Sequence, residues 1–321
     1  MTDNDKKRKN IFDKYAVHLR LLVENGIIQQ DLPFEETYIC PVCARPFSKD
    51  SLDQQNGNPL TLEDAPPKSL GGRANVLTCR ECNNTAGQQI DHHLTVRMHE
   101  LDQYQFVPGV EFHPVFENNG SVVQGTIKVN DKGQVDAKHS IKKNNPAVLE
   151  KYIAATSKDD VIDLKHRDSK VDVFRLQLAL LKTAYLMIFE KFGYAFLLDP
   201  AYDRLREQLR QPEKEIYPVG SWFHAEYYKP YQGVPFIVGK GLEGIFPIFV
   251  LNTGLMERTF AFIIPLTDKT AEKLLERVQA MLKEHKVFQS EMNGMDQRDY
   301  LFDIDAIKEM LTWIKKLSEV K

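Results

Sequence analysis

Two Cys-x-x-Cys pairs constrain the fold of this 321-residue chain more than any other feature. The pairs are Cys40/Cys43 and Cys79/Cys82, and they contain all 4 cysteines of the sequence. Each pair places two thiolates at one turn, so that both pairs together can surround a tetrahedral zinc ion at about 2.3 Å. We therefore expect one closed four-cysteine site with structural zinc (Zn2+), which offers no open ligand position for chemistry.

Two other interpretations of the cysteines are a redox pair and four ordinary buried thiols. A redox pair normally lies beside a β-α-β pattern, and buried thiols need no fixed spacing. Because no further cysteines exist to build a disulfide framework, a reduced, cytoplasmic protein fits best. The N-terminal residues 1–10 also lack the apolar run of a secretory signal peptide.

The segment 44–78 between the pairs is longer than the about 15 to 20 residues found between the pairs of a plain zinc ribbon. It contains the run LTLEDAPPKSLGG at residues 60–72, and Asn75 and Asn83 lie just before and directly after the second pair. This pattern resembles the zinc-stapled branch of the HNH endonuclease family, in which an acid-His-x-x-Pro hairpin precedes Gly-Gly and an Asn. The resemblance covers about residues 38–101.

The resemblance implies a ββα-metal fold that hydrolyses DNA phosphodiester bonds with one catalytic Mg2+ or Mn2+ ion. By position, Glu63 matches the first ligand of that ion and Asn83 matches the last. Asn75 matches the Asn that orients the loop of the general base. Asp91 follows Asn83 by about two helical turns, which makes it a further candidate ligand of the catalytic ion.

Asp64 stands where the family has the His that activates water. A free Asp titrates about 2.6 units below a free His, which costs up to about 3.5 kcal/mol of driving force for proton transfer. Repulsion from Glu63 in a partly desolvated site would raise the pKa of Asp64, or Asp64 would itself bind the metal. His92 and His93 are candidates for a substitute base or a further ligand, and a solvated helix face is their alternative interpretation.

Two rival functions stay open beside the nuclease. The first is a catalytically inactive zinc finger that binds nucleic acid or a partner protein. The second is a zinc-stapled α+β interaction scaffold without nucleic acid, in line with a net charge of -3 from 42 Lys plus Arg against 45 Asp plus Glu. The basic residues near enough in sequence to contact phosphate are Lys68, Arg73, Arg80 and Arg97.

The sequence predicts an α+β chain of four segments. They are an N-terminal helix in 1–37, the HNH-like module in 38–101, a small β-meander and linker in 102–170, and a mixed α+β C-terminal domain in 171–321. The linker is placed from about residue 142 onward, and the basic run 6–9 is expected to be a frayed tail. The meander is placed around two turns, at residues 118–120 and 131–133.

The most apolar stretch, Leu176 to Phe189, is shorter than the about 20 residues of a membrane span. It also carries Gln177 and Lys182, so we expect a buried helix and no membrane partner. The C-terminal domain is expected to bind a regulatory partner or a second copy of the chain. This arrangement would resemble nucleases of genome defence (antiviral defence) or of mobile elements, by analogy alone.

Overall fold

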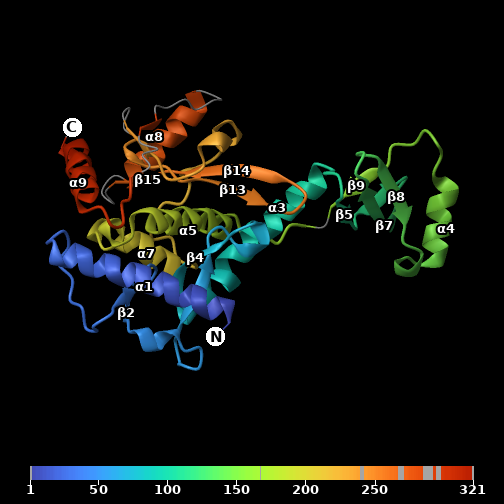
Figure 1. The fold of residues 1–321 in the computed structure, drawn as a ribbon. Helices are drawn as coiled ribbons and strands as arrows, with labels where there is room; N and C mark the ends of the chain where they lie inside the picture. Colours follow the sequence, from blue (N-terminus) through green and yellow to red (C-terminus); the bar gives the residue numbers. More distant parts are fainter. Residues whose placement is uncertain are drawn as a thin grey trace. The chain divides into compact units, whose positions relative to one another are not determined.

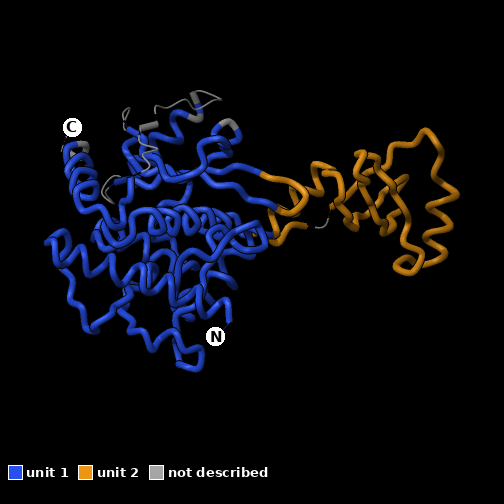
Figure 2. Tube along the Cα trace, viewed as in Figure 1, with its two compact units in different colours: residues 1–95, 172–252, 258–321 blue, residues 96–171, 253–257 orange. Residues whose placement is uncertain are grey.

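The computed structural model describes residues 2–166, 168–238, 242–266, 271–284, 292–293 and 298–319. The chain forms two compact units, shown in Figure 2: unit 1 contains residues 1–95, 172–252 and 258–321, and unit 2 contains 96–171 and 253–257. The predicted segment 1–37 and most of 38–101 and 171–321 belong to unit 1, whereas 102–170 lies in unit 2. The predicted α+β class is confirmed.

Helix α1 (Asp3–Glu24) opens unit 1. Thr2 caps it: its hydroxyl accepts a hydrogen bond from the Asp5 backbone N–H, and the Asp5 carboxylate accepts one from the Thr2 N–H. The basic run 6–9 therefore lies inside this capped helix, and the prediction of a frayed tail is wrong. Farther along, α1 buries an apolar face made by Ile11, Phe12, Tyr15, Leu19 and Leu22.

The cysteine module follows α1. Its elements are β1 (Tyr38–Ile39), β2 (Pro46–Phe47), a 3-10 turn (Lys49–Leu52), β3 (Leu60–Asp64), a second 3-10 turn (Lys68–Leu70), β4 (Ala74–Cys79), α2 (Arg80–Ala86), a π-helical turn (Gly87–Asp91) and α3 (His92–Tyr104). Strands β1 and β2 pair with each other, and β3 pairs with β4, both antiparallel. Helix α3 crosses from unit 1 into unit 2 at residue 95.

Helix α5 (Val173–Phe192) runs through the middle of unit 1 (Figure 1). Asp172 caps its first turn by accepting a hydrogen bond from the Arg175 N–H, and the helix ends at Gly193, whose φ is +56°. The predicted buried helix is confirmed, since most of its side chains are buried. None of the described helices is both long and apolar enough to span a membrane.

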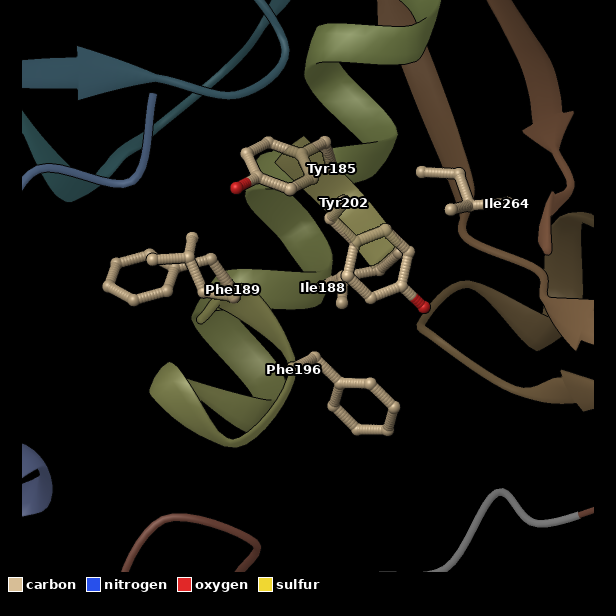
Figure 3. A pocket seen from close by; sticks show the side chains of 7 residues that line it. Tyr185, Ile188, Phe189, Phe196, Tyr202 and Ile264 are labelled. Atoms are coloured by element: carbon tan, nitrogen blue, oxygen red, sulfur yellow. The ribbon is translucent and has the colours of Figure 1, made fainter. Parts of the chain in front are cut away.

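Short helices α6 (Tyr194–Leu197) and α7 (Asp203–Arg210) continue from α5 after a tight turn and a 3-10 turn (Pro200–Tyr202). A small cavity of about 10 Å³ lies beside α5, and Figure 3 shows the apolar and aromatic side chains that line it. That volume is at the lower limit for a single water, and the lining is almost entirely apolar. The cavity is therefore a packing defect of the core and not a ligand site.

Two antiparallel sheets complete unit 1. The first has the order β10-β14-β13, and the second has the order β15-β12-β11-β16. Their bounds are β10 (Trp222–His224), β11 (Phe236–Ile237), β12 (Gly244–Ile245), β13 (Ile248–Asn252), β14 (Glu257–Phe262), β15 (Ile264–Pro265) and β16 (Met292–Asn293). A 3-10 turn spans Glu226–Tyr231, and helices α8 (Ala271–Glu284) and α9 (Ile304–Glu319) close the chain. The antiparallel pairing predicted for this region is confirmed.

Unit 2 contains the C-terminal part of α3, a small antiparallel sheet and helix α4. The sheet has the order β5-β7-β6-β9, and β8 pairs with residues 125–129 of β7. Bounds are β5 (Glu111–Phe112), β6 (Val115–Asn118), β7 (Ser121–Val129), β8 (Val135–His139), β9 (Asp163–Lys165) and α4 (Pro146–Ala155), with a 3-10 turn at Ile141–Lys143. At the first predicted turn, Asn119 and Gly120 both have positive φ, as a two-residue hairpin loop requires.

The segment predicted as a linker instead contains α4 and β9. Asn145 caps α4 by accepting a hydrogen bond from the Ala147 N–H, and Pro146 starts the helix. Leu149 and Tyr152, three residues apart on one face, then pack into the core of the sheet. The linker prediction is wrong because the polar composition of the segment outweighed these two core residues, Leu149 and Tyr152.

His18 on α1 makes the stability of unit 1 sensitive to acid. Its side chain is buried, neither ring nitrogen has a hydrogen-bond partner within the described ranges, and burial, together with the charge of Lys14, lowers its pKa to about 4. Between pH 6.5 and 4 the unfolded chain binds a proton that the folded chain excludes, so the free energy of unfolding falls as pH falls. Between pH 7 and pH 5 this loss is about 2 kcal/mol.

We expect His18→Leu to remove that part of the pH dependence. Urea unfolding at pH 7 and pH 5 measures it, with His99→Leu as the control because His99 is exposed. Equal pH dependence in wild type and His18→Leu would contradict the expectation.

Candidate metal centre and acidic cluster

The four cysteine side chains converge on one point. The Sγ atoms of Cys40, Cys43, Cys79 and Cys82 all lie within 4.8 Å of one another, and the Cys43 and Cys79 Sγ atoms are 3.8 Å apart. A zinc ion with bonds of about 2.3 Å to four sulfurs would separate neighbouring sulfurs by about 3.8 Å. The cysteines are therefore positioned to bind one metal ion, and four thiolates at this spacing are compatible with structural zinc.

Arg45 donates hydrogen bonds to this cluster. Its Nε lies 3.3 Å from the Cys43 sulfur, its Nη2 lies 3.5 Å from the Cys79 sulfur, and its guanidinium also pairs with Glu81. Hydrogen bonds from the neighbouring thiols, that of Cys40 first, and from Arg45 lower the pKa of the Cys43 thiol. These donors favour the thiolate form that a metal ion requires.

The turn between β3 and β4 is fixed by its two glycines. Gly71 has a φ of +83°, a conformation that other residues rarely adopt. A Cβ atom on Gly72 would lie 1.5 Å from the carbonyl oxygen of Pro66, so only glycine fits there. The Pro-Pro and Gly-Gly pairs of the sequence thus shape one tight connection that follows the acidic residues.

The acidic cluster consists of Glu63 and Asp64 at the end of β3 and Asp91 in the π-helical turn. The register of β3 with β4 shifts between Glu63 and Asp64, because Glu63 lies opposite Val76 and Asp64 opposite Ala74, so that Asn75 is an extra residue on β4. Glu63 is buried, whereas Asp64 and Asp91 are half-buried.

Lys182 of helix α5 contacts two members of the acidic cluster. Its Nζ lies 2.7 Å from Glu63 Oε1 and 2.6 Å from Asp91 Oδ2, and its side chain is only 1% exposed. The other Glu63 oxygen accepts a hydrogen bond of 2.9 Å from the Thr78 hydroxyl. From the sequence, Lys182 serves only as an argument against a membrane span and is not assigned to the site, although one lysine inside an apolar helix signals a buried anionic partner.

Burial and like charge shape the titration of the cluster. Burial, then the charge of Glu63, raises the pKa of Asp64. Burial, partly offset by the charge of Lys182, raises the pKa of Asp91 to about 6. Burial alone would lower the pKa of Lys182, but the carboxylates of Glu63 and Asp91 outweigh it and raise that pKa. Counted formally, three carboxylates against the one ammonium of Lys182 give the cluster a net charge of about −2.

Asn83 and Asn75 have separate partners. The Asn83 side-chain N–H groups donate to Thr61 Oγ1 at 3.0 Å and to the Leu62 carbonyl at 2.9 Å, which ties α2 to β3. The Asn75 amide donates to Glu190 Oε1 on α5 at 2.9 Å. Asn83 thus sits against the acidic strand, whereas Asn75 links the hairpin to α5.

The two candidate histidines lie on the first turn of α3. His92 is exposed, and its ring centroid lies 5.8 Å from that of His93. His93 Nδ1 accepts a hydrogen bond of 3.1 Å from the Asp172 backbone N–H at the start of α5. His93 is therefore engaged at a helix end, and among the described residues neither imidazole forms a hydrogen bond or ion pair with the carboxylate of Glu63, Asp64 or Asp91.

The candidate phosphate-binding residues differ in their exposure and in their partners. Lys68 and Arg73 are exposed, and the charge of Lys68 acts on Asp64. Arg80 donates to the Gln54 carbonyl at 2.7 Å, which closes the loop before β3. Arg97 pairs with Glu100 at 3.1 Å, in unit 2. Lys68 and Arg73 thus keep their charged ends in solvent.

Neither a protein-family model, nor a curated protein, nor a solved structure matches this chain. The functional assignment below therefore rests on residues and geometry.

Proposed function

We propose that residues 38–101 form an HNH-type, ββα-metal endonuclease module that hydrolyses DNA phosphodiester bonds with a divalent ion. The observation that carries the proposal is the acidic cluster, with its formal net charge of about −2, in the same module as the cysteine cluster. The order hairpin β3–β4 and then α2, with one cysteine pair ending the hairpin, supports it. Four thiolates would hold zinc as the structural staple of the module.

The donor set of the acidic cluster suits a hard divalent cation. Asp91 Oδ1 is buried and has no hydrogen-bond partner among the residues that the structure describes. One divalent ion would balance the net charge of about −2 and satisfy this oxygen, since Mg2+ and Mn2+ prefer oxygen ligands. We infer that Asp91 and the Asn83 amide oxygen would hold the ion, which leaves Asp64 for proton transfer. Glu63 already uses both oxygens for Lys182 and Thr78.

The bound ion would neutralise negative charge on the scissile phosphate and the leaving oxygen. The chain's own residues would do the rest. Asp64, whose pKa is raised by burial, would accept the proton of the attacking water. Lys68 and Arg73, both exposed, would contact the phosphates of DNA.

One observation favours a second candidate, the inactive binding module. Lys182 already neutralises part of the charge on Glu63 and Asp91, so the cluster is an ion pair without any added metal. In that case the module would bind DNA or a partner protein without cutting. The role of the rest of unit 1 in regulation, self-association or genome defence is a proposal by analogy alone.

A plasmid-nicking assay tests the proposal. The zinc-loaded protein is incubated with supercoiled DNA in Mg2+, Mn2+ or Ni2+, and in a parallel sample without added divalent ion. We expect open-circular product only with the ion. Absence of nicking with all three metals, also after Asp64→His, would contradict the nuclease. Binding of labelled duplex at low salt would then favour the second candidate, because phosphate contacts are strongest there.

A further inference from the structure

Lys182 is the most deeply buried charged side chain in contact with the acidic cluster. It reaches that cluster from α5, 119 residues after Glu63 and 91 after Asp91 in the chain. An ammonium group pays a large desolvation penalty when it leaves water, so it is stable there only with anionic partners. The anionic partners are Glu63, whose Oε1 lies 2.7 Å from Lys182 Nζ, and Asp91, whose Oδ2 lies 2.6 Å from it.

The same two contacts fix the carboxylates. Glu63 is held between Lys182 and the Thr78 hydroxyl, and Asp91 Oδ2 is held by Lys182, so that Asp91 Oδ1 is the oxygen left without a partner. An ammonium is a point charge of +1 that can hold two carboxylates near each other without filling every oxygen. Lys182 thereby offsets one negative charge of the cluster. Because it binds Asp91 through Oδ2, it leaves Asp91 Oδ1 without a partner among the described residues.

We propose that Lys182 is a positioning residue that sets the affinity of the acidic cluster for a divalent cation. It holds Glu63 and Asp91 in place and competes electrostatically with the cation for their charge. This inference rests on the proposed function only in so far as that function requires a cation at the cluster. Metal affinity tests it without any DNA cleavage.

The test is the binding of Mn2+ to zinc-loaded protein, measured by the electron paramagnetic resonance signal of free Mn2+. Lys182→Met removes the competing positive charge, so the formal net charge of the cluster becomes more negative, from about −2 to about −3. We expect Mn2+ to bind this variant at least tenfold more tightly, because a unit charge a few ångströms away acts strongly in a buried site. Without Mn2+ the variant should unfold at a lower temperature, and added Mn2+ should raise that temperature more than in wild type.

Two controls separate charge from structure. Lys191→Met removes a lysine from the same helix, where it lies over the Tyr300 ring, and should leave the Mn2+ affinity unchanged. The double variant Glu63→Gln with Lys182→Met removes one charge of each sign and keeps the net charge near −2. Its Mn2+ affinity should lie within about threefold of wild type. This variant leaves only Asp91 without its ammonium, whereas the single variant leaves both Glu63 and Asp91 unpaired.

The inference is overturned if Lys182→Met binds Mn2+ as wild type does, or if the double variant departs from wild type by more than tenfold. A merely structural lysine would give the first result. Failure of the nuclease proposal is a different outcome: wild type would then fail to nick DNA while the Mn2+ affinities still followed the charge at position 182.

Discussion

Cys40→Ser is expected to abolish zinc binding and to unfold the module around β3 and β4. Serine is a poor zinc ligand, and Cys40 is fully buried among the other three sulfurs. Structural zinc in small fingers contributes about 10 to 16 kcal/mol of apparent binding free energy, as much as the whole stability of an ordinary domain. Metal analysis should fall from one zinc per chain to nearly none, and hydrogen exchange in 60–79 should rise to that of an unfolded chain.

A thiol count on wild-type protein gives the control for Cys40→Ser. The chain has 4 cysteines in total, so a chelator that removes zinc should release four reactive thiols per zinc ion. Cys43 and Cys82 line a cleft of about 350 Å³, which gives the chelator access. Four thiols reactive without chelator, or a disulfide formed by mild oxidation, would favour the redox interpretation instead.

The four-cysteine cluster could be predicted from sequence because the Cys-x-x-Cys spacing is a local pattern. Each Cys-x-x-Cys pair sets the geometry of its own turn, and the two pairs meet where the Cys79 backbone N–H donates to Cys40 Sγ at 3.4 Å. The same holds for the hairpin turn. Gly71 is required there by its positive φ, and Gly72 is required because the Pro66 carbonyl oxygen leaves no room for a Cβ atom. In both cases a few neighbouring residues determine the local structure.

The charge balance of the acidic cluster could not be predicted in this way. Glu63 and Asp91 meet Lys182, and Asn75 meets Glu190, only because α5 packs against the module in the folded chain. No spacing rule links residues about a hundred positions apart. A buried lysine inside an apolar helix shows that some anion must be near it, but not which one.

Helix α5 therefore completes the cysteine module as well as supporting it. The Tyr185 hydroxyl of α5 donates to the Pro41 carbonyl at 2.8 Å, and the Tyr194 hydroxyl, at the start of α6 just after α5, donates to the Ile39 carbonyl at 3.0 Å, next to the first cysteine pair. Separated from α5, residues 38–101 would expose these contacts and leave Glu63 buried without its ammonium. The resemblance to an autonomous finger thus describes the local pattern, while the folding unit is larger.

Asp64→Ala is expected to lower the rate of metal-dependent plasmid nicking by about 10²- to 10⁴-fold, the range lost with a general base. The variant should nevertheless fold. Burial and the charge of Glu63 raise the pKa of Asp64, so its ionised form is disfavoured in the folded chain and its removal relieves repulsion. We expect the unfolding midpoint at pH 7 to stay the same or to rise, while activity falls.

Asp50→Ala is the matched control, because Asp50 is an exposed carboxylate in the same module. It should nick DNA at the wild-type rate. Wild-type nicking by Asp64→Ala would show that Asp64 takes no part in the chemistry. A lower unfolding midpoint in Asp64→Ala would instead contradict the repulsion with Glu63.

Asp64→His separates the two roles that Asp64 can have. If Asp64 accepts the proton of water, an imidazole at this position restores the base found in the HNH family, and activity with Mg2+ is kept or increased. If Asp64 mainly binds the ion, the variant replaces a hard oxygen ligand by nitrogen, which Mg2+ binds poorly and Ni2+ binds well. The ratio of nicking rates in Mg2+ and Ni2+ therefore distinguishes them: an unchanged ratio identifies the base, and a shift of about tenfold or more towards Ni2+ identifies the ligand.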